Sequence, residues 1–411
     1  MNLLTEGVEK NLVQKTDLAI KLTIDGVTAS YPVYRIRLDC LYYNDRNDRI
    51  ATWINKYRSE HDGLIFDKSD IGVYNSIIHQ FIEESNPDAI KRTENNIGMV
   101  NQREPGVVLL DGRIIDGNRR FTCLRNLSKK DTQKFNYFEA AIIKESIESN
   151  EKQIKMLELQ LQMGAETRVD YNPIDRLVGV YQDIVENKLL TVKEYAQSAN
   201  KSEAEVNKDV ELAKLLVEFL EMINAPKQFY MARDMDLNGP LVELNSILKN
   251  AKDDEYKNQI KNVAFVNLLT QPDGDMTRFI RNMKQIVKAP AQYLDEFLEK
   301  ELECSEKIIN GLPPIGKVTP SYISELRSQE NVKEKFRQIM DLSTTKVKAL
   351  ITKNIPLKNV MKAIELLNSI DSGMFEKLSL DQRMELKQKI GELIERCEPL
   401  RDKLDVSGSA T

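Results

Sequence analysis

Two adjacent arginines follow an Asp-Gly-Asn turn, and this arrangement could bind an anion. The run is Asp116, Gly117, Asn118, Arg119 and Arg120, between a β-prone segment and one with helical spacing. Glycine permits unusual backbone angles, and Asn118 is predicted to cap the helix that follows. The arginines would then occupy the first helical turn, where a cation costs about 0.3–1 kcal/mol. A bound phosphate would offset that cost, because backbone N–H groups and two guanidinium groups would converge on it.

A simpler arrangement is also open, in which both arginines are exposed and Asp116 is their partner. Residues 101–130 form the most basic window of the N-terminal part, with seven basic side chains against three acidic ones. This window is where the sequence predicts contacts with phosphate groups.

The segment Ile115–Leu124 resembles the glycine–x–arginine–arginine box of the ParB/sulfiredoxin superfamily. In that family the strand-to-helix turn holds nucleotide phosphates. Sulfiredoxins carry a catalytic cysteine in this turn, whereas Cys123 falls inside the predicted helix here, so we expect a small buried residue. The resemblance implies phosphate binding by Gly117, Asn118, Arg119 and Arg120.

Other segments resemble further boxes of the same family. Asn44–Arg49 is similar to the box after the first strand, and Gly98–Pro105 is similar to the loop that touches the base or ribose, with several extra residues. Arg168–Asp175 resembles the arginine–acid–leucine–asparagine–proline segment of ParB proteins. The resemblance therefore adds to the nucleotide-binding residues Arg46, Arg49, Gln102, Arg103 and Arg168.

The expected metal contact departs from the ParB pattern. A glutamate–asparagine pair helps ParB proteins hold metal and triphosphate, and Gly164 and Ala165 stand in those places here. Either the contact has moved, with Glu158 and Gln162 as the candidate residues, or it is absent.

The elements that position these residues are mixed in residues 1–145. Asp25-Gly26 and Asp111-Gly112 predict two tight hairpins. We further expect helices over 50–60, 71–97 and 119–127, and a strand over 138–143.

Beyond residue 146 the chain is predicted to be helical. Leu190–Leu212 has the spacing of a helix-turn-helix, with Asn200 at the left-handed turn. Its second helix carries three lysines against four carboxylates, and an acidic face would repel DNA. We therefore interpret it as a packing or dimerising module more readily than as a DNA reader.

The predicted fold class is an α+β ParB/sulfiredoxin-like N-terminal domain followed by all-α domains that include a helix-turn-helix. At roughly 100–200 residues per domain, 411 residues predict two or three domains. The predicted ranges are 1–145, 146–225 and 226–411, with a further boundary at 311–316.

Composition excludes several functional classes. The balance of 59 basic and 64 acidic residues excludes nucleic-acid coating through bulk positive charge. Four scattered cysteines and two histidines exclude a zinc finger. No apolar run approaches the ~20 residues that span a bilayer, and the chain is predicted to be cytoplasmic, with no membrane partner and with reduced thiols.

The predicted function is ParB-like nucleotide binding in DNA maintenance or in phage or plasmid biology. The expected cofactor is a nucleoside triphosphate, CTP or ATP, with Mg²⁺. Asp116 and Glu104 are the candidate catalytic residues for triphosphate hydrolysis, and Glu158 and Asp116 are the candidate metal ligands. DNA and a second copy of the chain are the expected partners, together with an unidentified protein bound by the C-terminal helices.

Three alternatives remain open. A metal-dependent DNA nuclease would use the arginines to clamp a backbone phosphate, and a small-molecule kinase would use the same fold. A non-catalytic assembly protein would bind a phosphate of DNA or of a partner.

Overall fold

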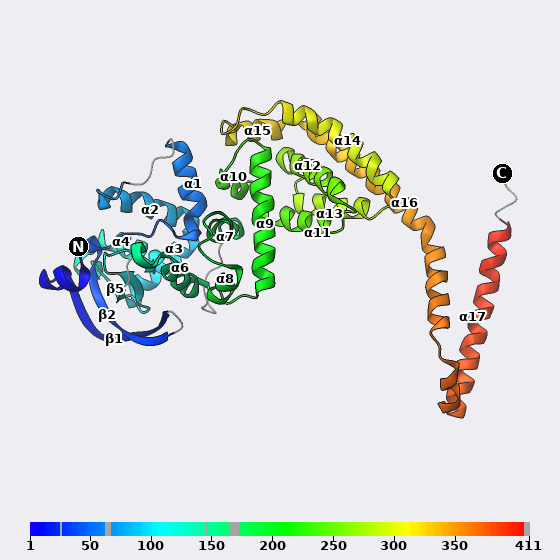
Figure 1. Cartoon of the computed structure of the whole chain (residues 1–411), viewed down its shortest axis with the longest axis horizontal. Coiled ribbons are helices and arrows are strands. Elements are labelled where there is room, and N and C mark those ends of the chain that lie inside the picture. The colour runs from blue at the N-terminus through cyan, green and yellow to red at the C-terminus, as the bar shows by residue number, and fades with distance from the viewer. Residues whose placement is uncertain (25–26, 62–66, 145–146, 164–171, 407–411) are drawn as a thin grey trace. The chain divides into compact units, whose positions relative to one another are not determined.

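The computed structural model describes residues 1–24, 27–61, 67–144, 147–163 and 172–406 (Figure 1). The chain forms two compact units, Met1–Thr344 and Thr345–Thr411. The domain boundaries predicted near residues 146, 226 and 311–316 would subdivide the first of these units, and they stay predictions.

A five-stranded mixed sheet forms the N-terminal part of the first unit. Its order is β1-β2-β5-β3-β4, antiparallel except for the parallel pair β3 and β5. The antiparallel strand pairing of both predicted hairpins is confirmed, while the turn residues of the first, Asp25 and Gly26, lie outside the described residues. The strands are β1 Val13–Ile24, β2 Val27–Arg37, β3 Gly106–Leu109, β4 Ile114–Asp116 and β5 Tyr137–Ile143.

Helices pack on both faces of the sheet, because alternate strand residues point in opposite directions. On one face, Val108 and Phe138 share a core with helices α2 (Ile71–Ser85), α3 (Pro87–Val100) and α4 (Asn118–Ser128). On the other face, Val107 and Ile115 pack against Ile154 of α6 (Ile147–Met163). The turn between β4 and α4 is therefore held in place by buried side chains on both faces of the sheet.

One predicted helix, 71–97, is two helices. Asn86 accepts a hydrogen bond from Ala89 N, and Pro87 is the first residue of the second helix, a position that favours proline. The helices of this region are α1 Ala51–Glu60, α2 Ile71–Ser85, α3 Pro87–Val100, α4 Asn118–Ser128 and α5 Thr132–Phe135, with short turns at Leu3–Gly7, Leu38–Cys40 and η3 Asp48–Ile50.

The predicted helix–turn–helix pattern is present as α8 Val192–Ser198 and α9 Glu203–Met222. Asn200 joins them with φ 53°, as its place at the turn predicted. Thr191 and Ser202 each form a capping box at the start of a helix. The preceding elements are α6 Ile147–Met163, α7 Pro173–Val180 and η4 Tyr181–Glu186.

The described chain beyond residue 226 is helical, as predicted. The coarse prediction of an α+β part followed by helices is confirmed. None of the helices in the described ranges is long and apolar enough to cross a membrane. The helices are α10 Phe229–Asp234, α11 Asn238–Leu248, α12 Asp254–Thr270, α13 Met276–Val287, α14 Ala291–Asn310, α15 Pro320–Ser328, α16 Glu330–Asn368, η5 Ser372–Lys377 and α17 Leu380–Val406.

Candidate functional site

The turn that begins α4 depends on Gly117. This residue has φ 105° and ψ 14°, in the left-handed region, and occupies the N-cap position. A Cβ at this position would lie 2.7 Å from Cζ of Phe138. The prediction that Asn118 caps the helix is wrong, because the left-handed glycine turns the chain one residue earlier and Asn118 becomes the first helical residue.

The first backbone N–H groups of α4 have no acceptor within the helix. The first bond within the helix runs from Phe121 N to Gly117 O, at 2.9 Å. No side chain in the described ranges caps this end. The N–H groups of residues 118–120 precede that first bond and have no acceptor within the helix. An anion at this end would find both the donors and the positive end of the helix dipole.

A cavity of about 650 Å³ lies at this helix end. That volume is within the usual 300–1,000 Å³ of small-molecule pockets. Its charged lining consists of five arginines and two carboxylates, so its positive charge exceeds its negative charge by three. The arginines are Arg49, Arg92, Arg103, Arg119 and Arg120, and the carboxylates are Glu104 and Asp116.

Arg120 has internal carboxylate partners. Its Nη2 lies 2.7 Å from Asp116 Oδ2, and its Nη1 lies 3.0 Å from Glu104 Oε2. The Asp116 side chain is 12% exposed, whereas that of Glu104 is 84% exposed. The contact with Asp116 that the simpler arrangement expected is therefore present for Arg120, but the expected exposure of both arginines is wrong, since the Arg120 side chain is 16% exposed and Arg119 is half-buried. Both candidate catalytic residues hold the same guanidinium group.

Arg119 differs from its neighbour. It is half-buried, and it has no carboxylate partner in the ranges that the structure describes. Burial, followed by the positive charges of nearby arginines, lowers the pKa of Arg119 to about 10. The group remains a cation at neutral pH. The half-buried cation therefore favours binding of an anion beside it.

Asn118 also presents an unsatisfied group at this cavity. The residue is 7% exposed, and its buried Oδ1 finds no hydrogen-bond partner among the described residues. Its backbone oxygen accepts a bond from Thr122 Oγ1 at 2.9 Å. A buried polar atom without a partner costs about 1–3 kcal/mol. A ligand that donates to this oxygen would remove that cost.

The loop before β3 is tied to the sheet by Gln102. Its Nε2 donates to Glu139 O at 2.7 Å, and its Oε1 accepts from Glu139 N at 2.9 Å. Gln102 therefore lines the cavity, but its amide already fixes the loop to β5. Arg103 lines the same cavity and is exposed.

Two predicted residues lie at a second cavity, of about 530 Å³. Arg46 pairs with Glu151. Glu158 is buried and accepts bonds from Asn44 Nδ2 at 3.4 Å and from Gln162 Nε2 at 2.9 Å. Burial raises the pKa of Glu158 to about 8, although the charge of Lys155 acts against this rise. Of the two metal candidates, Asp116 lines the first cavity and Glu158 the second.

Metal ligands do not gather at either candidate. In the described part of the chain, no three His, Cys, Asp or Glu side chains are placed together to hold an ion. Arg168 lies outside the described residues, as do Gly164 and Ala165.

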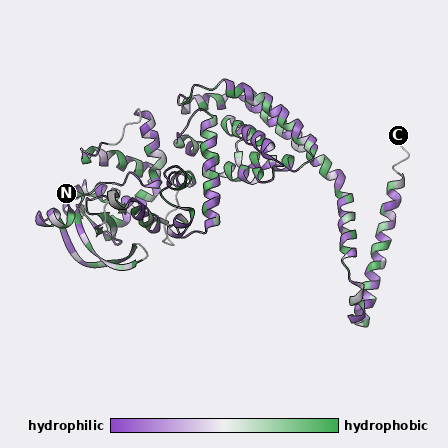
Figure 2. Ribbon diagram, viewed as in Figure 1, coloured by the Kyte–Doolittle hydropathy of each residue, from purple (hydrophilic) through white to green (hydrophobic). Residues whose placement is uncertain are grey.

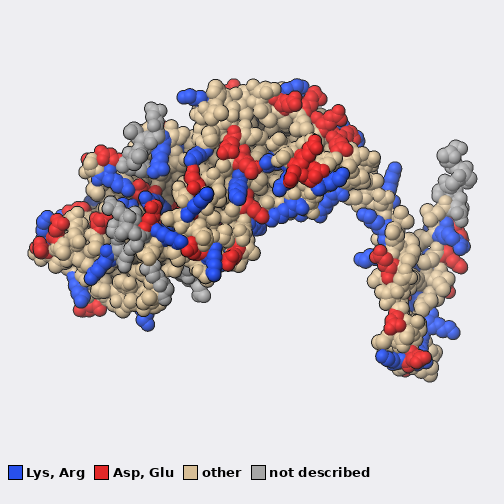
Figure 3. Space-filling model, in the orientation of Figure 1, with Lys and Arg blue, Asp and Glu red and all other residues tan. Residues whose placement is uncertain are grey.

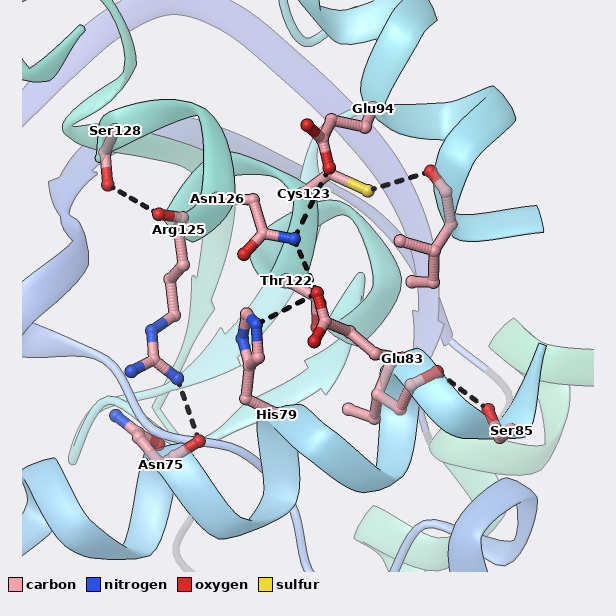
Figure 4. Close-up of polar contacts among 12 residues, drawn as sticks. Asn75, His79, Glu83, Ser85, Glu94, Thr122, Cys123, Arg125, Asn126 and Ser128 are labelled. Atoms are coloured by element: carbon pink, nitrogen blue, oxygen red, sulfur yellow. Dashed lines mark hydrogen bonds and ion pairs between the residues drawn. The ribbon is translucent and has the colours of Figure 1, made fainter. Parts of the chain in front are cut away.

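A hydrogen-bond network fixes α4 from behind. Tyr43 Oη lies 2.8 Å from Thr122 Oγ1 and 3.1 Å from His79 Nδ1. Figure 4 shows His79 and Asn126 both meeting the Glu83 carboxylate, at 3.3 and 2.6 Å. Burial lowers the pKa of His79. Through Thr122 this network reaches the backbone of Asn118, and it therefore holds the first turn of α4 in place.

Sequence reasoning missed the contribution of α3. Arg92, Thr93 and Asn96 line the cavity from one side of this helix. Asn96 follows Arg92 by four residues and Thr93 by three, which places it beside both on the helix surface, but only the packing of α3 on α4 makes that face part of the site.

No protein-family model matches this chain, and no curated protein matches its sequence significantly. The resemblance to the ParB/sulfiredoxin superfamily therefore rests on the short segments given above.

Proposed function

We propose that this protein binds a nucleoside triphosphate, CTP or ATP, in the cavity at the start of α4, as a ParB-like nucleotide-dependent switch. The observation that supports this most is Arg119, a half-buried cation beside the uncapped end of α4 with no carboxylate partner among the described residues. Two independent sources of positive potential thus meet at one cavity.

The phosphates would bind at the positive end of the cavity. The N–H groups of residues 118–120 and the guanidinium groups of Arg119, Arg49 and Arg92 supply donors. Charge-assisted bonds of this kind are short and strong. Ile50, Ile82 and Ile97 add an apolar lining on which the base would pack.

Hydrolysis would need Asp116 or Glu104 to leave Arg120. In this arrangement both carboxylates contact that guanidinium group. The expected Mg²⁺ would neutralise phosphate charge, and Asp116 is the cavity carboxylate nearest in sequence to the phosphate-binding turn. Triphosphate binding followed by slow turnover fits these residues best.

Calorimetry with CTP, ATP, GTP and UTP, each with Mg²⁺, tests the proposal. We expect binding of at least one triphosphate, weakened about 10–100-fold by Arg119→Met because a charge-assisted contact contributes ~1.5–3 kcal/mol. Arg278→Met is the matched control, since Arg278 is exposed on α13 and does not line the cavity. Absence of heat with all four nucleotides, or equal affinity in the two variants, would reject the proposal.

A second candidate function, association with duplex DNA, is favoured by the basic face of α13. Met276–Lys288 contains four basic residues and no acidic one. Figure 3 shows Lys and Arg gathered along the edge of the molecule at α11 and α13. Arg281 pairs with Glu243 at 2.7 Å, while Arg278 and Lys288 are exposed. The four basic residues, Arg278, Arg281, Lys284 and Lys288, have helical spacing along one face.

This second candidate has its own test. Fluorescence anisotropy with a labelled duplex should show salt-sensitive binding, and Arg278→Ala with Lys288→Ala should reduce the slope of log K against log salt by roughly two. Lys300→Ala with Lys307→Ala is the control, because both lysines pair with glutamates on their own helix. Unchanged slopes would rule out α13 as the DNA contact. In α9, by contrast, the first turn carries Glu203 and Glu205, both exposed.

A further inference from the structure

The second compact unit consists of helices that bury almost nothing. Between residues 348 and 404, no described side chain is buried. Figure 2 shows apolar residues repeated along both helices of this unit. Large apolar side chains on α17 include Ile390 at 40%, Leu400 at 62% and Leu404 at 75% exposure. Long helices in water depend on packing of an apolar face, so a partner must cover these side chains.

The apolar side chains of α17 follow a coiled-coil pattern. From Leu386 onward they recur with alternating spacings of four and three residues, which places them at the d and a positions of heptads. Six consecutive core positions are apolar, and none of them is buried. We call this row the α17 seam: Leu386, Ile390, Leu393, Cys397, Leu400 and Leu404.

The residues that flank the α17 seam are basic. Positions e and g between residues 386 and 404 hold five cations, one isoleucine and no carboxylate. The carboxylates of the same helix lie at positions b, c and f, away from the seam, as Glu392, Glu395 and Glu398 do. The five flanking cations are Lys387, Lys389, Arg396, Arg401 and Lys403.

The flanking charges decide what covers the seam. In a parallel pair of two copies, Arg396 at g would face Arg401 at e of the other chain, and an antiparallel pair also sets cations against cations. Like charges at these positions select against self-pairing. A partner helix with an apolar seam and carboxylates at e and g would pack its apolar residues on the α17 seam and pair its carboxylates with the flanking cations.

A membrane surface fits the same helix less well. Helices that lie on anionic bilayers carry cations across their polar face. The polar face of α17 opposite its seam carries Glu395 and Asp402, at position f, which anionic headgroups would repel. The apolar row is also narrow, as in a coiled-coil seam rather than a broad membrane-facing surface.

We propose that α17 is a docking helix for an amphipathic helix of another protein, one with an apolar heptad seam flanked by Glu or Asp. The interaction forms a two-stranded coiled coil in which the partner's carboxylates pair with the five flanking cations. It is independent of nucleotide binding at α4, and it gives the second unit a role in recruitment.

Designed peptides test the proposal on the full chain. One peptide of four heptads carries Ile at a, Leu at d and Glu at e and g, and the matched peptide carries Lys at e and g. We expect the glutamate peptide to bind at least tenfold more tightly in low salt. Lys387→Glu with Arg396→Glu and Arg401→Glu should reverse this preference, and Leu393→Asn should weaken both complexes. Circular dichroism of each variant checks that the helical content is kept.

Three outcomes would overturn the proposal. The first is equal binding of both peptides, or no change of preference in the triple charge variant. The second is a stable dimer of the full chain in sedimentation, together with a disulfide between two chains that forms on oxidation and does not form in Cys397→Ser. An in-register parallel pair of α17 helices would bring the Cys397 residues of the two copies, both at position a, close enough for this disulfide. The third is binding to vesicles containing phosphatidylserine with no binding to the glutamate peptide.

Discussion

Arg119 and Arg120 are adjacent in the first turn of α4, yet only Arg120 contacts carboxylates in the described part of the chain, Asp116 at 2.7 Å and Glu104 at 3.0 Å. One guanidinium group therefore stabilises the turn, while its neighbour remains available to a ligand. This division of roles has consequences for stability that can be measured without any ligand.

Substituting the two arginines should have different effects on the stability of the fold. Arg120→Met removes the cation that contacts both Asp116 and Glu104 and should lower the free energy of unfolding by about 1–3 kcal/mol. Arg119→Met keeps the aliphatic packing and removes a half-buried cation near other arginines, so stability should be unchanged or higher. Urea unfolding of both variants makes the comparison, and a larger loss in Arg119→Met would contradict it.

Gly117→Ala should be strongly destabilising. The substitution places a Cβ 2.7 Å from Phe138 Cζ at a residue with φ 105°. Each source of strain costs on the order of 1–3 kcal/mol, and triphosphate affinity should fall because the α4 donors move. The matched control is Gly274→Ala, since a Cβ at Gly274 meets nothing within 4 Å. Thermal unfolding that shows equal melting temperatures for the two variants would disprove the role of Gly117.

Glu301 should make stability depend on pH. It is fully buried, and Asn267 Nδ2 donates to its Oε2 at 2.8 Å, while Glu301 Oε1 and Asn267 Oδ1 lack partners among the described residues. A proton on Glu301 supplies the missing donor. Burial raises the pKa of Glu301 from 4.5 to about 8. The folded state therefore keeps this proton up to about pH 8, whereas the unfolded state releases it near pH 4.5.

The contribution of Glu301 to stability is consequently full below about pH 4.5 and is lost as pH rises towards 8. Glu301→Gln supplies an N–H donor at every pH, so its advantage over the natural chain should grow across this window, by at most about 1.4 kcal/mol per pH unit. Denaturant unfolding from pH 5 to 8.5 measures the difference. Glu303→Gln, at an exposed position, is the control. If the free energies of unfolding of Glu301→Gln and the natural chain change with pH in parallel, Glu301 is not the group responsible.

Alkylation should separate the four cysteines. Cys397 is exposed, whereas Cys123 is fully buried and its Sγ donates to Ile90 O at 3.5 Å. Burial raises the pKa of the Cys123 thiol to about 12, so little thiolate forms at pH 8. Iodoacetamide followed by peptide mass spectrometry should modify Cys397 first and Cys123 last. Fast modification of Cys123 in the folded chain would contradict its burial in the core and would make a reactive thiol in α4 a hypothesis to test.

The sequence predicted the parts of the site that are local. The Asp111-Gly112 hairpin, the strand that ends at Asp116 and the helix with its two arginines all depend on neighbours within a few residues, and the structure contains them. Pro87 also marked the break between α2 and α3, but the apolar periodicity obscured it.

The remaining features depend on tertiary packing. Arg92 joins the cavity only because α3 packs on α4, and Arg46 leaves it because Glu151 of α6 binds it elsewhere. The sequence also could not assign the charge partners of Arg120, or show that Arg119 has none among the described residues, since both arginines have the same neighbours in sequence. The side-chain geometry alone separates them.

The bonds between Gln102 and Glu139 limit how the cavity can open. They hold the side chain of Gln102, two residues before Glu104, against β5, and the exposed Glu104 carboxylate can leave Arg120 by rotating its own side chain. Side-chain rotation at an exposed position takes picoseconds to nanoseconds. An incoming triphosphate would therefore meet no slow loop step, and its association rate would be set by diffusion and by the attraction of the arginines.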